Sequence, residues 1–209
     1  MKHRKIVYIS PGSLGLCDKH YKDVLSDAAS PSTEIDTMHL SMMEQDESPF
    51  LSPYPFYHSE LFRAIVEAEK DGYQAAIIGC SADPGLVEAR RMASIPVTAP
   101  LEANLHLAAM MGMKRVSILV PGTQDESILY NDLARSYGLE HVIASITPVD
   151  LDYPDSQDTA RMIKEDPDQL RRLILDCHRS ALEGDVLQLA KKILREDGSS
   201  CIYFGCTLW

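Results

Sequence analysis

Short apolar runs typical of strands alternate along this chain with runs whose apolar residues recur at helical spacing. The strand-like runs are Lys5–Ser10, Gln74–Gly79, Ile95–Thr98, Arg115–Val120 and Cys201–Gly205. The helix-like runs are Ser59–Lys70, one starting at Asp83-Pro84, Pro100–Met111, Ser127–Tyr137, and Asp168–Arg195 with a break near Gly184. The alternation predicts an α/β protein with a largely parallel sheet, because parallel strands need crossover helices between them.

Two short strand-end signatures occur twice, in the same order. The chain reads VYISPGS, ending at Ser13, then AIIGCS, ending at Ser81; later it reads SILVPGT, ending at Thr123, then IYFGCT, ending at Thr207. This order predicts two similar lobes, each a mostly parallel sheet flanked by helices, related by pseudo-two-fold symmetry. We place the first lobe at residues 1–98 and the second at 99–209. Each should carry one hydroxyl loop and one cysteine at the carboxyl ends of its strands, where open α/β sheets place their sites.

Two long segments, Ser41–His58 and Thr147–Asp158, are rich in proline. The first also contains methionines and aromatic residues, and the second contains several aspartates. Loops of this length in a compact domain are usually functional or disordered. We therefore interpret them either as lids or interface elements, or as disordered insertions.

The charge balance narrows the classes of partner. The 209 residues carry a formal net charge of −11. A surface of that sign repels phosphate backbones and acidic lipids, so we expect neither nucleic acid nor a membrane surface as a partner. No apolar run approaches the roughly 20 residues of a membrane span. Five cysteines without an export signal favour reduced thiols in a cytoplasmic protein.

Two of the five cysteines share an unusual context. Cys80 and Cys206 both follow a glycine, both precede a hydroxyl residue, and both end an apolar strand. We interpret the other three, Cys17, Cys177 and Cys201, as small apolar fillers, because unpaired cysteine is among the most buried residue types.

Two thiols on opposite sides of a carbon next to a carbonyl can act as base and acid and exchange these roles with the handedness of the substrate. The predicted helix start at Asp83-Pro84 should lower the pKa of the Cys80 thiol through the helix dipole. The backbone amides of Ser81 and Ala82 could hold an anionic substrate oxygen. We interpret Asp83 itself as a helix cap rather than as a base.

Other common chemistries lack their motifs. The histidines show no spacing typical of a zinc site, so we expect no metal. There is no dinucleotide fingerprint, no Walker-type lysine and no Gly-x-Ser-x-Gly elbow. We expect no cofactor.

The stretch AIIGCSADPGLVEARRMASIPVTAPLEANLHLAAMMG and the terminal FGCTLW resemble the aspartate/glutamate/hydantoin racemase superfamily, and the hydantoin racemase branch most closely. The resemblance implies cofactor-independent racemisation by two thiols in a two-lobed α/β fold. It assigns Cys80 and Cys206 as the two bases. It also implies anion-holding roles for the neighbours Ser81, Ala82 and Thr207, and a substrate contact from the second lobe by Thr123.

The chain departs from that branch at three places. Ser10-Pro11-Gly12-Ser13 stands where the branch has Asn-Pro-Asn, which leaves Ser13 as the substitute for an amide side chain. The usual Ser-Ile-Glu segment is not recognisable in SPFLSPYPFYHSE. The sequence ends three residues after Cys206, where members of the branch continue with a helix, so we expect the natural chain to continue; the alternative is a truncated, inactive relative.

We therefore predict a racemase or epimerase that acts on an amino acid or a hydantoin-like derivative, as a homo-oligomer with a small-molecule carboxylate or hydantoin-like substrate. One alternative is an isomerase or decarboxylase of the same superfamily that uses a single cysteine. Another is a small-molecule binding protein that has lost the chemistry.

Overall fold

The computed structural model describes residues 3–11, 15–40, 54–113, 115–122, 124–154 and 156–209. The chain forms two compact units, and each contains one parallel β-sheet with helices. The first unit comprises Met1–Cys80, Pro84–Ala99 and Pro154–Arg171; the second comprises Ser81–Asp83, Pro100–Tyr153 and Arg172–Trp209. The predicted α/β class with two parallel sheets is confirmed. The division into 1–98 and 99–209 and the pseudo-two-fold relation stay predictions.

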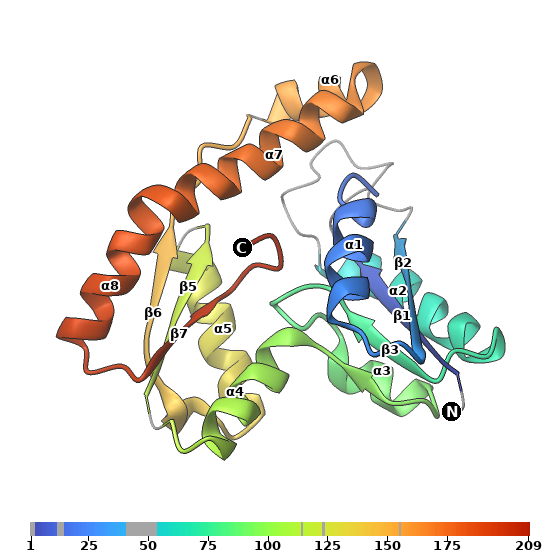
Figure 1. The fold of residues 1–209 in the computed structure, drawn as a ribbon, viewed down its shortest axis with the longest axis horizontal. Coiled ribbons are helices and arrows are strands. Elements are labelled where there is room, and N and C mark those ends of the chain that lie inside the picture. The colour runs from blue at the N-terminus through green and yellow to red at the C-terminus, as the bar shows by residue number, and fades with distance from the viewer. Residues whose placement is uncertain (1–2, 12–14, 41–53, 114, 123, 155) are drawn as a thin grey trace. The chain divides into compact units, whose positions relative to one another are not determined.

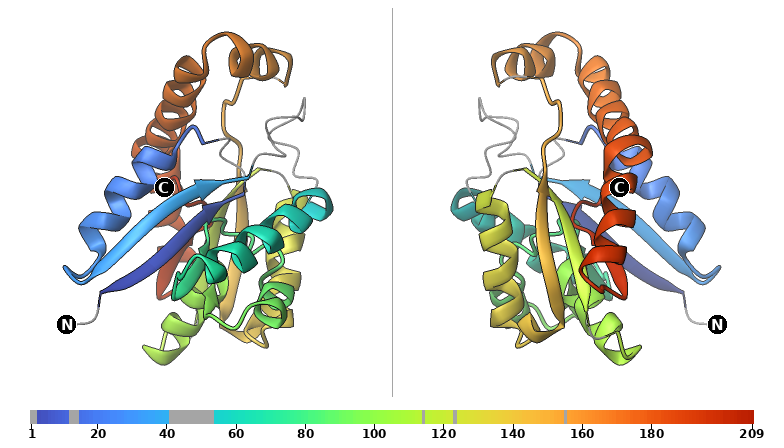
Figure 2. Two further views of the ribbon diagram at one scale, coloured as in Figure 1. Left: turned by 90° about the vertical axis from the view of Figure 1, so that its right-hand side faces the viewer. Right: turned by 90° about the vertical axis from the view of Figure 1, so that its left-hand side faces the viewer.

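The first unit is built on a four-stranded sheet in the order β2-β1-β3-β4, with all neighbours parallel. Its strands are β1 (Arg4–Ser10), β2 (Thr33–His39), β3 (Ala75–Ile78) and β4 (Val97–Thr98). Its helices are α1 (Asp18–Ala28), α2 (Tyr54–Lys70), α3 (Leu86–Met92) and α6 (Ser156–Glu165). Helix α1 lies on one face of the sheet and α2 on the other (Figures 1 and 2), so the last residues of the central strand β1 are buried on both faces.

The second unit is built on a three-stranded parallel sheet in the order β6-β5-β7. The strands are β5 (Val116–Pro121), β6 (Ile143–Val149) and β7 (Cys201–Phe204). The other elements are α4 (Pro100–Met110), α5 (Gln124–Ser136), the short η2 (Glu140–Val142), α7 (Pro167–Ala181), which begins in the first unit, η3 (Leu182–Val186) and α8 (Leu187–Glu196). Helices α5 and α8 cover opposite faces of the sheet (Figure 2), and the central strand β5 is buried over its first five residues.

The strand register of the two sheets repeats as the sequence signatures do. In the first sheet Ile9 of β1 lies opposite Ile78 of β3. In the second, Leu119 of β5 lies opposite Phe204 of β7. In both sheets the strand that carries the Pro-Gly signature is central and the strand that leads into Gly-Cys pairs with it. The internal repeat therefore corresponds to a repeated strand pairing.

Most element ends agree with the sequence, because glycines that stop helices have the predicted conformation. Helix α2 ends before Gly72 and α4 before Gly112, and both glycines have a positive φ. The break near Gly184 is also confirmed, since this residue has non-helical angles (φ −95°, ψ −112°) between α7 and α8. The sequence pattern did not predict α1, β2, β6 or α6. The segment Thr147–Asp158, expected to be a loop, includes residues that belong to β6 and α6.

The predicted start of the helix after Cys80 is wrong. Helix α3 begins at Leu86, not at Asp83-Pro84, because Gly85 caps it in the left-handed conformation (φ +62°). A Cβ on Gly85 would lie 2.6 Å from a ring carbon of Phe62 on α2. Only glycine satisfies both the backbone angle and this close contact.

No helix among the described residues is long and apolar enough to cross a membrane. The segment Ser41–Pro53, which contains most of the first long loop, lies outside the described residues.

The core of the second unit offers a direct test of this packing. Leu119 is fully buried against Val186, Ala190 and Ile193. Leu119→Ala should lower the free energy of unfolding by about 2–5 kcal/mol, because it removes buried methyl groups and leaves a cavity. Leu194→Ala is the matched control, since Leu194 is exposed on α8. Urea denaturation of both variants measures the difference, and equal losses would contradict this assignment of the core.

Candidate active site

The two predicted catalytic cysteines occupy equivalent places in their sheets. Gly79 and Cys80 follow the last residue of β3, and Gly205 and Cys206 follow the last residue of β7. Both cysteines are half-buried. Each therefore lies at the carboxyl end of a parallel strand, beside the central strand of its own sheet.

A backbone hydrogen bond attaches each Gly-Cys segment to its central strand. The Gly79 N–H donates to the carbonyl of Ile9 at 2.7 Å, and the Gly205 N–H donates to the carbonyl of Leu119 at 2.7 Å. These bonds continue the parallel ladder by one residue beyond the strands. They determine where the chain leaves each sheet, and hence the position of the backbone of each cysteine.

The residues after Cys80 form a buried turn. Ser81 and Ala82 are almost completely buried, at 4% and 5% exposure. They belong to the second unit, whereas Cys80 belongs to the first, so the chain passes between the units at this peptide bond. Thr207, which follows Cys206, is half-buried. Ser13 and Thr123, the other two predicted substrate-binding residues, lie outside the described residues.

The prediction that Asp83 caps the helix directly after it is wrong, because Gly85 caps α3 and the Asp83 carboxylate caps α4 instead. One carboxylate oxygen accepts a hydrogen bond from the backbone N–H of Leu101 and the other from that of Glu102, both at 2.8 Å. Both amides belong to the first turn of α4. The Tyr137 hydroxyl donates to the carboxylate at 3.1 Å. Asp83 thus anchors the turn Ser81–Asp83 to α4, and it has the one positive φ (+45°) among the described non-glycine residues.

The environment of this carboxyl group alters its proton affinity. Asp83 is 2% exposed, and burial raises its pKa to about 6, against the opposing effect of the two amides and the tyrosine hydroxyl. A buried carboxylate costs free energy in its charged form, and hydrogen bonds only partly offset that cost. The cap is therefore sensitive to protonation at mildly acidic pH.

The structure brings together an acid and a histidine that the sequence analysis did not connect. The Nδ1 atom of His39, the last residue of β2, donates to the Asp18 carboxylate at 2.8 Å. His39 lies opposite Ser10 in the sheet, at the same carboxyl edge as Cys80. Gly15 makes room for the ring, since a Cβ there would lie 2.8 Å from its Cε1 atom. Pairing with a carboxylate fixes the orientation of an imidazole.

A second histidine, which unlike His39 is buried, lies close in space to the last described residue. His178 on α7 is 1% exposed, and its Nε2 atom lies 2.6 Å from the Tyr153 hydroxyl oxygen. Its ring packs edge to face against Trp209, with ring centroids 5.7 Å apart. Its Nδ1 atom finds no hydrogen-bond partner among the described residues. Burial lowers the pKa of His178 to about 4, so the ring is neutral at physiological pH.

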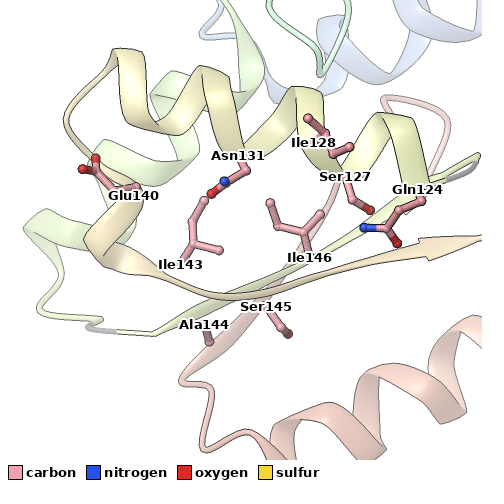
Figure 3. Close-up of a pocket in the computed structure, with 9 residues that line it drawn as sticks. All are labelled: Gln124, Ser127, Ile128, Asn131, Glu140, Ile143, Ala144, Ser145 and Ile146. Atoms are coloured by element: carbon pink, nitrogen blue, oxygen red, sulfur yellow. The ribbon is translucent and has the colours of Figure 1, made fainter.

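A pocket of about 340 Å³ lies in the second unit between α5 and β6, as Figure 3 shows. Ile143 and Ile146 project from β6 toward Ser127, Ile128 and Asn131 on α5. Of the predicted site residues that the structure describes (Cys80, Ser81, Ala82, Cys206 and Thr207), none lines it. Among the residues that the structure describes, no three His, Cys, Asp or Glu side chains are placed to hold a metal ion. We therefore base the candidate site on the strand-end cysteines.

Comparison with known proteins identifies related sequences. The model of the family described as Asp/Glu/Hydantoin racemase matches residues 19–207. A hydantoin racemase of Rhizobium meliloti is 29% identical over 142 residues, which are 68% of this chain and 50% of that protein. The chain thus spans half the length of this relative. A hydantoin racemase of Pseudomonas sp. (strain NS671) is 24% identical over 204 residues, or 97% of this chain and 72% of that protein.

The fold of this chain also resembles that of a protein of solved structure. An allantoin racemase from Klebsiella pneumoniae superposes with a TM-score of 0.77 at 22% identity, and the alignment covers 98% of this chain and 75% of the other. At this level of identity the similarity shows that the fold is shared.

The Asp83 cap should give the protein a characteristic pH dependence. The unfolded carboxyl loses its proton near pH 3.8, whereas the folded one keeps it to about pH 6. Wild type should therefore lose stability relative to Asp83→Asn as the pH rises from about 4 to 6, by on the order of 3 kcal/mol. Urea denaturation across this range measures the difference. Parallel stability curves for the two proteins would contradict the assignment.

His178 should act in the opposite direction. An unfolded histidine takes up a proton near pH 6.5, whereas folded His178 resists protonation down to about pH 4. Wild type should lose stability relative to His178→Gln as the pH falls from about 6.5 to 4, by on the order of 3 kcal/mol. Glutamine is the matched variant because it keeps a neutral polar group near the Tyr153 hydroxyl. Thermal unfolding at a series of pH values is the measurement, and a pH-independent difference would contradict the prediction.

Proposed function

Because this chain belongs to the Asp/Glu/hydantoin racemase family, we propose that it is a cofactor-independent racemase or epimerase of an amino acid or a hydantoin-like derivative. The observation that carries the proposal is the pair of Gly-Cys segments with equivalent attachments. Each follows a strand paired with the central strand of its sheet, and each glycine donates to that strand at 2.7 Å. A racemase that inverts a carbon needs a base and an acid, and two equivalent thiols supply both.

In the proposed reaction, the thiolate of Cys80 removes the proton from the carbon next to the carbonyl of one enantiomer. The C–H electron pair moves toward the carbonyl oxygen, and a planar enolate forms. The thiol of Cys206 then donates its proton to the opposite face of the carbon. After turnover Cys80 is a thiol and Cys206 a thiolate, which is the protonation state required for the other enantiomer.

Stabilisation of the enolate oxygen must contribute much of the rate. General acid–base catalysis supplies typically 10²–10⁴-fold, far less than most enzymes achieve. We propose that the amides of Ser81 and Ala82 donate to the developing oxyanion. Burial of both residues and the anchoring of their turn to α4 by Asp83 support this role, because preorganised donors in a dry site stabilise charge most strongly.

For the substrate we propose a small cyclic ureide or a related amino-acid derivative. Two relatives of this chain are named as hydantoin racemases, and the allantoin racemase has the same fold as this chain. Hydantoin and allantoin both carry an acidic C–H next to a carbonyl, which suits proton abstraction by a thiolate.

Solvent deuterium incorporation tests the proposal. We expect the full chain in D₂O to exchange the α-proton of at least one member of a panel of hydantoins, allantoin and amino acids, and to racemise it. Cys80→Ser and Cys206→Ser should each lower racemisation by about 10²-fold or more, because each removes one of the two proton carriers. Proton NMR follows the exchange and chiral chromatography follows the racemisation.

Cys201→Ser is the matched control, because Cys201 lies at the opposite end of β7 from Cys206. Its activity should stay close to wild type. If no substrate exchanges its proton, the racemase proposal is wrong. If exchange and product formation depend on one cysteine alone, the two-thiol mechanism is wrong and a one-thiol reaction replaces it.

A further inference from the structure

Both Gly-Cys segments share a feature beyond the backbone bonds. In the first unit the hydroxyl of Tyr8 donates to the carbonyl oxygen of Gly79 at 3.3 Å. In the second unit the hydroxyl of Tyr130 donates to the carbonyl oxygen of Gly205 at 2.7 Å. Both tyrosines are 5% exposed. In each unit a buried phenol therefore holds the peptide group whose nitrogen belongs to the predicted catalytic cysteine.

The two kinds of bond together hold each glycine on both sides. The N–H of the glycine is bonded to the central strand, and its carbonyl is bonded to the tyrosine. The peptide plane before the cysteine can then rotate only if a buried hydrogen bond breaks. Breaking such a bond leaves a buried carbonyl unsatisfied, which is costly. The position of each cysteine Cα is thus determined by its tyrosine as well as by its sheet.

The identity of the glycines follows from the same packing. A Cβ on Gly79 would lie 2.3 Å from the Cζ atom of Tyr8. A Cβ on Gly205 would lie 3.1 Å from Cε1 of Tyr130 and 2.8 Å from Cγ1 of Val120. Each tyrosine ring therefore lies directly against its glycine, so the phenol reaches the carbonyl only because no side chain intervenes.

The two tyrosines come from different kinds of element. Tyr8 belongs to the central strand β1, whereas Tyr130 belongs to helix α5. In the second half of the internal repeat, the position of Tyr8 is occupied by Ile118. The same bond to the same carbonyl is thus made from non-equivalent positions. An inherited repeat does not explain this agreement, whereas a shared requirement for a fixed Gly-Cys peptide does.

We propose that Tyr8 and Tyr130 are positioning residues for the two proton transfers, Tyr8 for Cys80 and Tyr130 for Cys206. The proposal rests on the two-thiol function proposed above. Proton transfer at carbon needs the sulfur close to the C–H bond and aligned with it, and misplacement by about 1 Å can cost about 10²-fold in rate. Each hydroxyl should therefore influence its own cysteine and leave the other unaffected.

The experiment compares Tyr8→Phe with Tyr130→Phe, because each change removes a hydroxyl and preserves the ring. The matched control is Tyr73→Phe, which removes the bond from Tyr73 to the Asp36 carboxylate (2.8 Å) before the start of β3. Both test variants should racemise about 10- to 100-fold more slowly than wild type. The control should stay close to wild type. Circular dichroism confirms folding, and if Tyr8→Phe does not fold, Tyr130→Phe carries the test alone.

Primary isotope effects with α-deuterated substrates separate positioning from a general loss of structure. Tyr8→Phe should raise the isotope effect for the enantiomer whose proton Cys80 removes, and lower it for the other. Tyr130→Phe should give the reverse pattern, because its slow step is the transfer at Cys206. A change that is equal for the two enantiomers, or no change in either variant, overturns the proposal.

Alkylation by iodoacetamide, followed by peptide mass spectrometry, gives a readout that needs no substrate. Tyr8→Phe should change the alkylation rate of Cys80 several-fold and leave that of Cys206 unchanged, and Tyr130→Phe should do the opposite. This selectivity supports the positioning role even if wild type exchanges no α-proton. Absence of exchange would contradict only the proposed function. Equal effects on both cysteines, or none, overturn the positioning role.

Discussion

The pairing of each Gly-Cys strand with a buried central strand is the constraint on which the candidate site depends. Parallel strands bring their carboxyl ends to one edge of a sheet, and a single backbone bond from Gly79 or Gly205 extends that order to the cysteine. Burial of the central strands β1 and β5 makes slippage of the register costly. The helices on both faces provide that burial, so the helical layers and the site are coupled through these two strands.

Two buried ionisable side chains near the cysteine segments, Asp83 and His178, lower the stability of the fold over part of the acidic pH range. Asp83 holds the turn after Cys80 against α4, and its burial raises the carboxyl pKa to about 6. His178 packs against Trp209 in the second unit, and its burial lowers the imidazole pKa to about 4. The Asp83 carboxyl makes the folded state more stable toward the low-pH end of this range, whereas the His178 ring makes it more stable toward the high-pH end. Proteins commonly accept such costs at functional sites, where orientation matters more than stability.

Local signals explain why much of the fold could be predicted. The short apolar runs that lead to Cys80 and to Cys206 are both strands, as their composition predicts: β3 alternates half-buried and buried residues, and β7 is half-buried throughout. Glycines such as Gly72 and Gly112 end helices because they adopt positive φ without strain. The start of α3 could not be predicted in this way. It depends on the ring of Phe62 from α2, which packs against Gly85.

The sequence by itself determined the family, the α/β class and the order of the repeated signatures, and it is the basis for proposing Cys80 and Cys206, rather than the other three cysteines, as the catalytic pair. These inferences depend on residues that are adjacent or periodic in the sequence, so they require no knowledge of which elements pack against each other. Only the tertiary structure decided that Asp83 caps α4, that His39 pairs with Asp18, and that Tyr8 and Tyr130 hold the two glycine carbonyls. These partners are far apart in the chain, and no local pattern records them, because a hydrogen bond depends on where two elements meet rather than on their spacing in sequence.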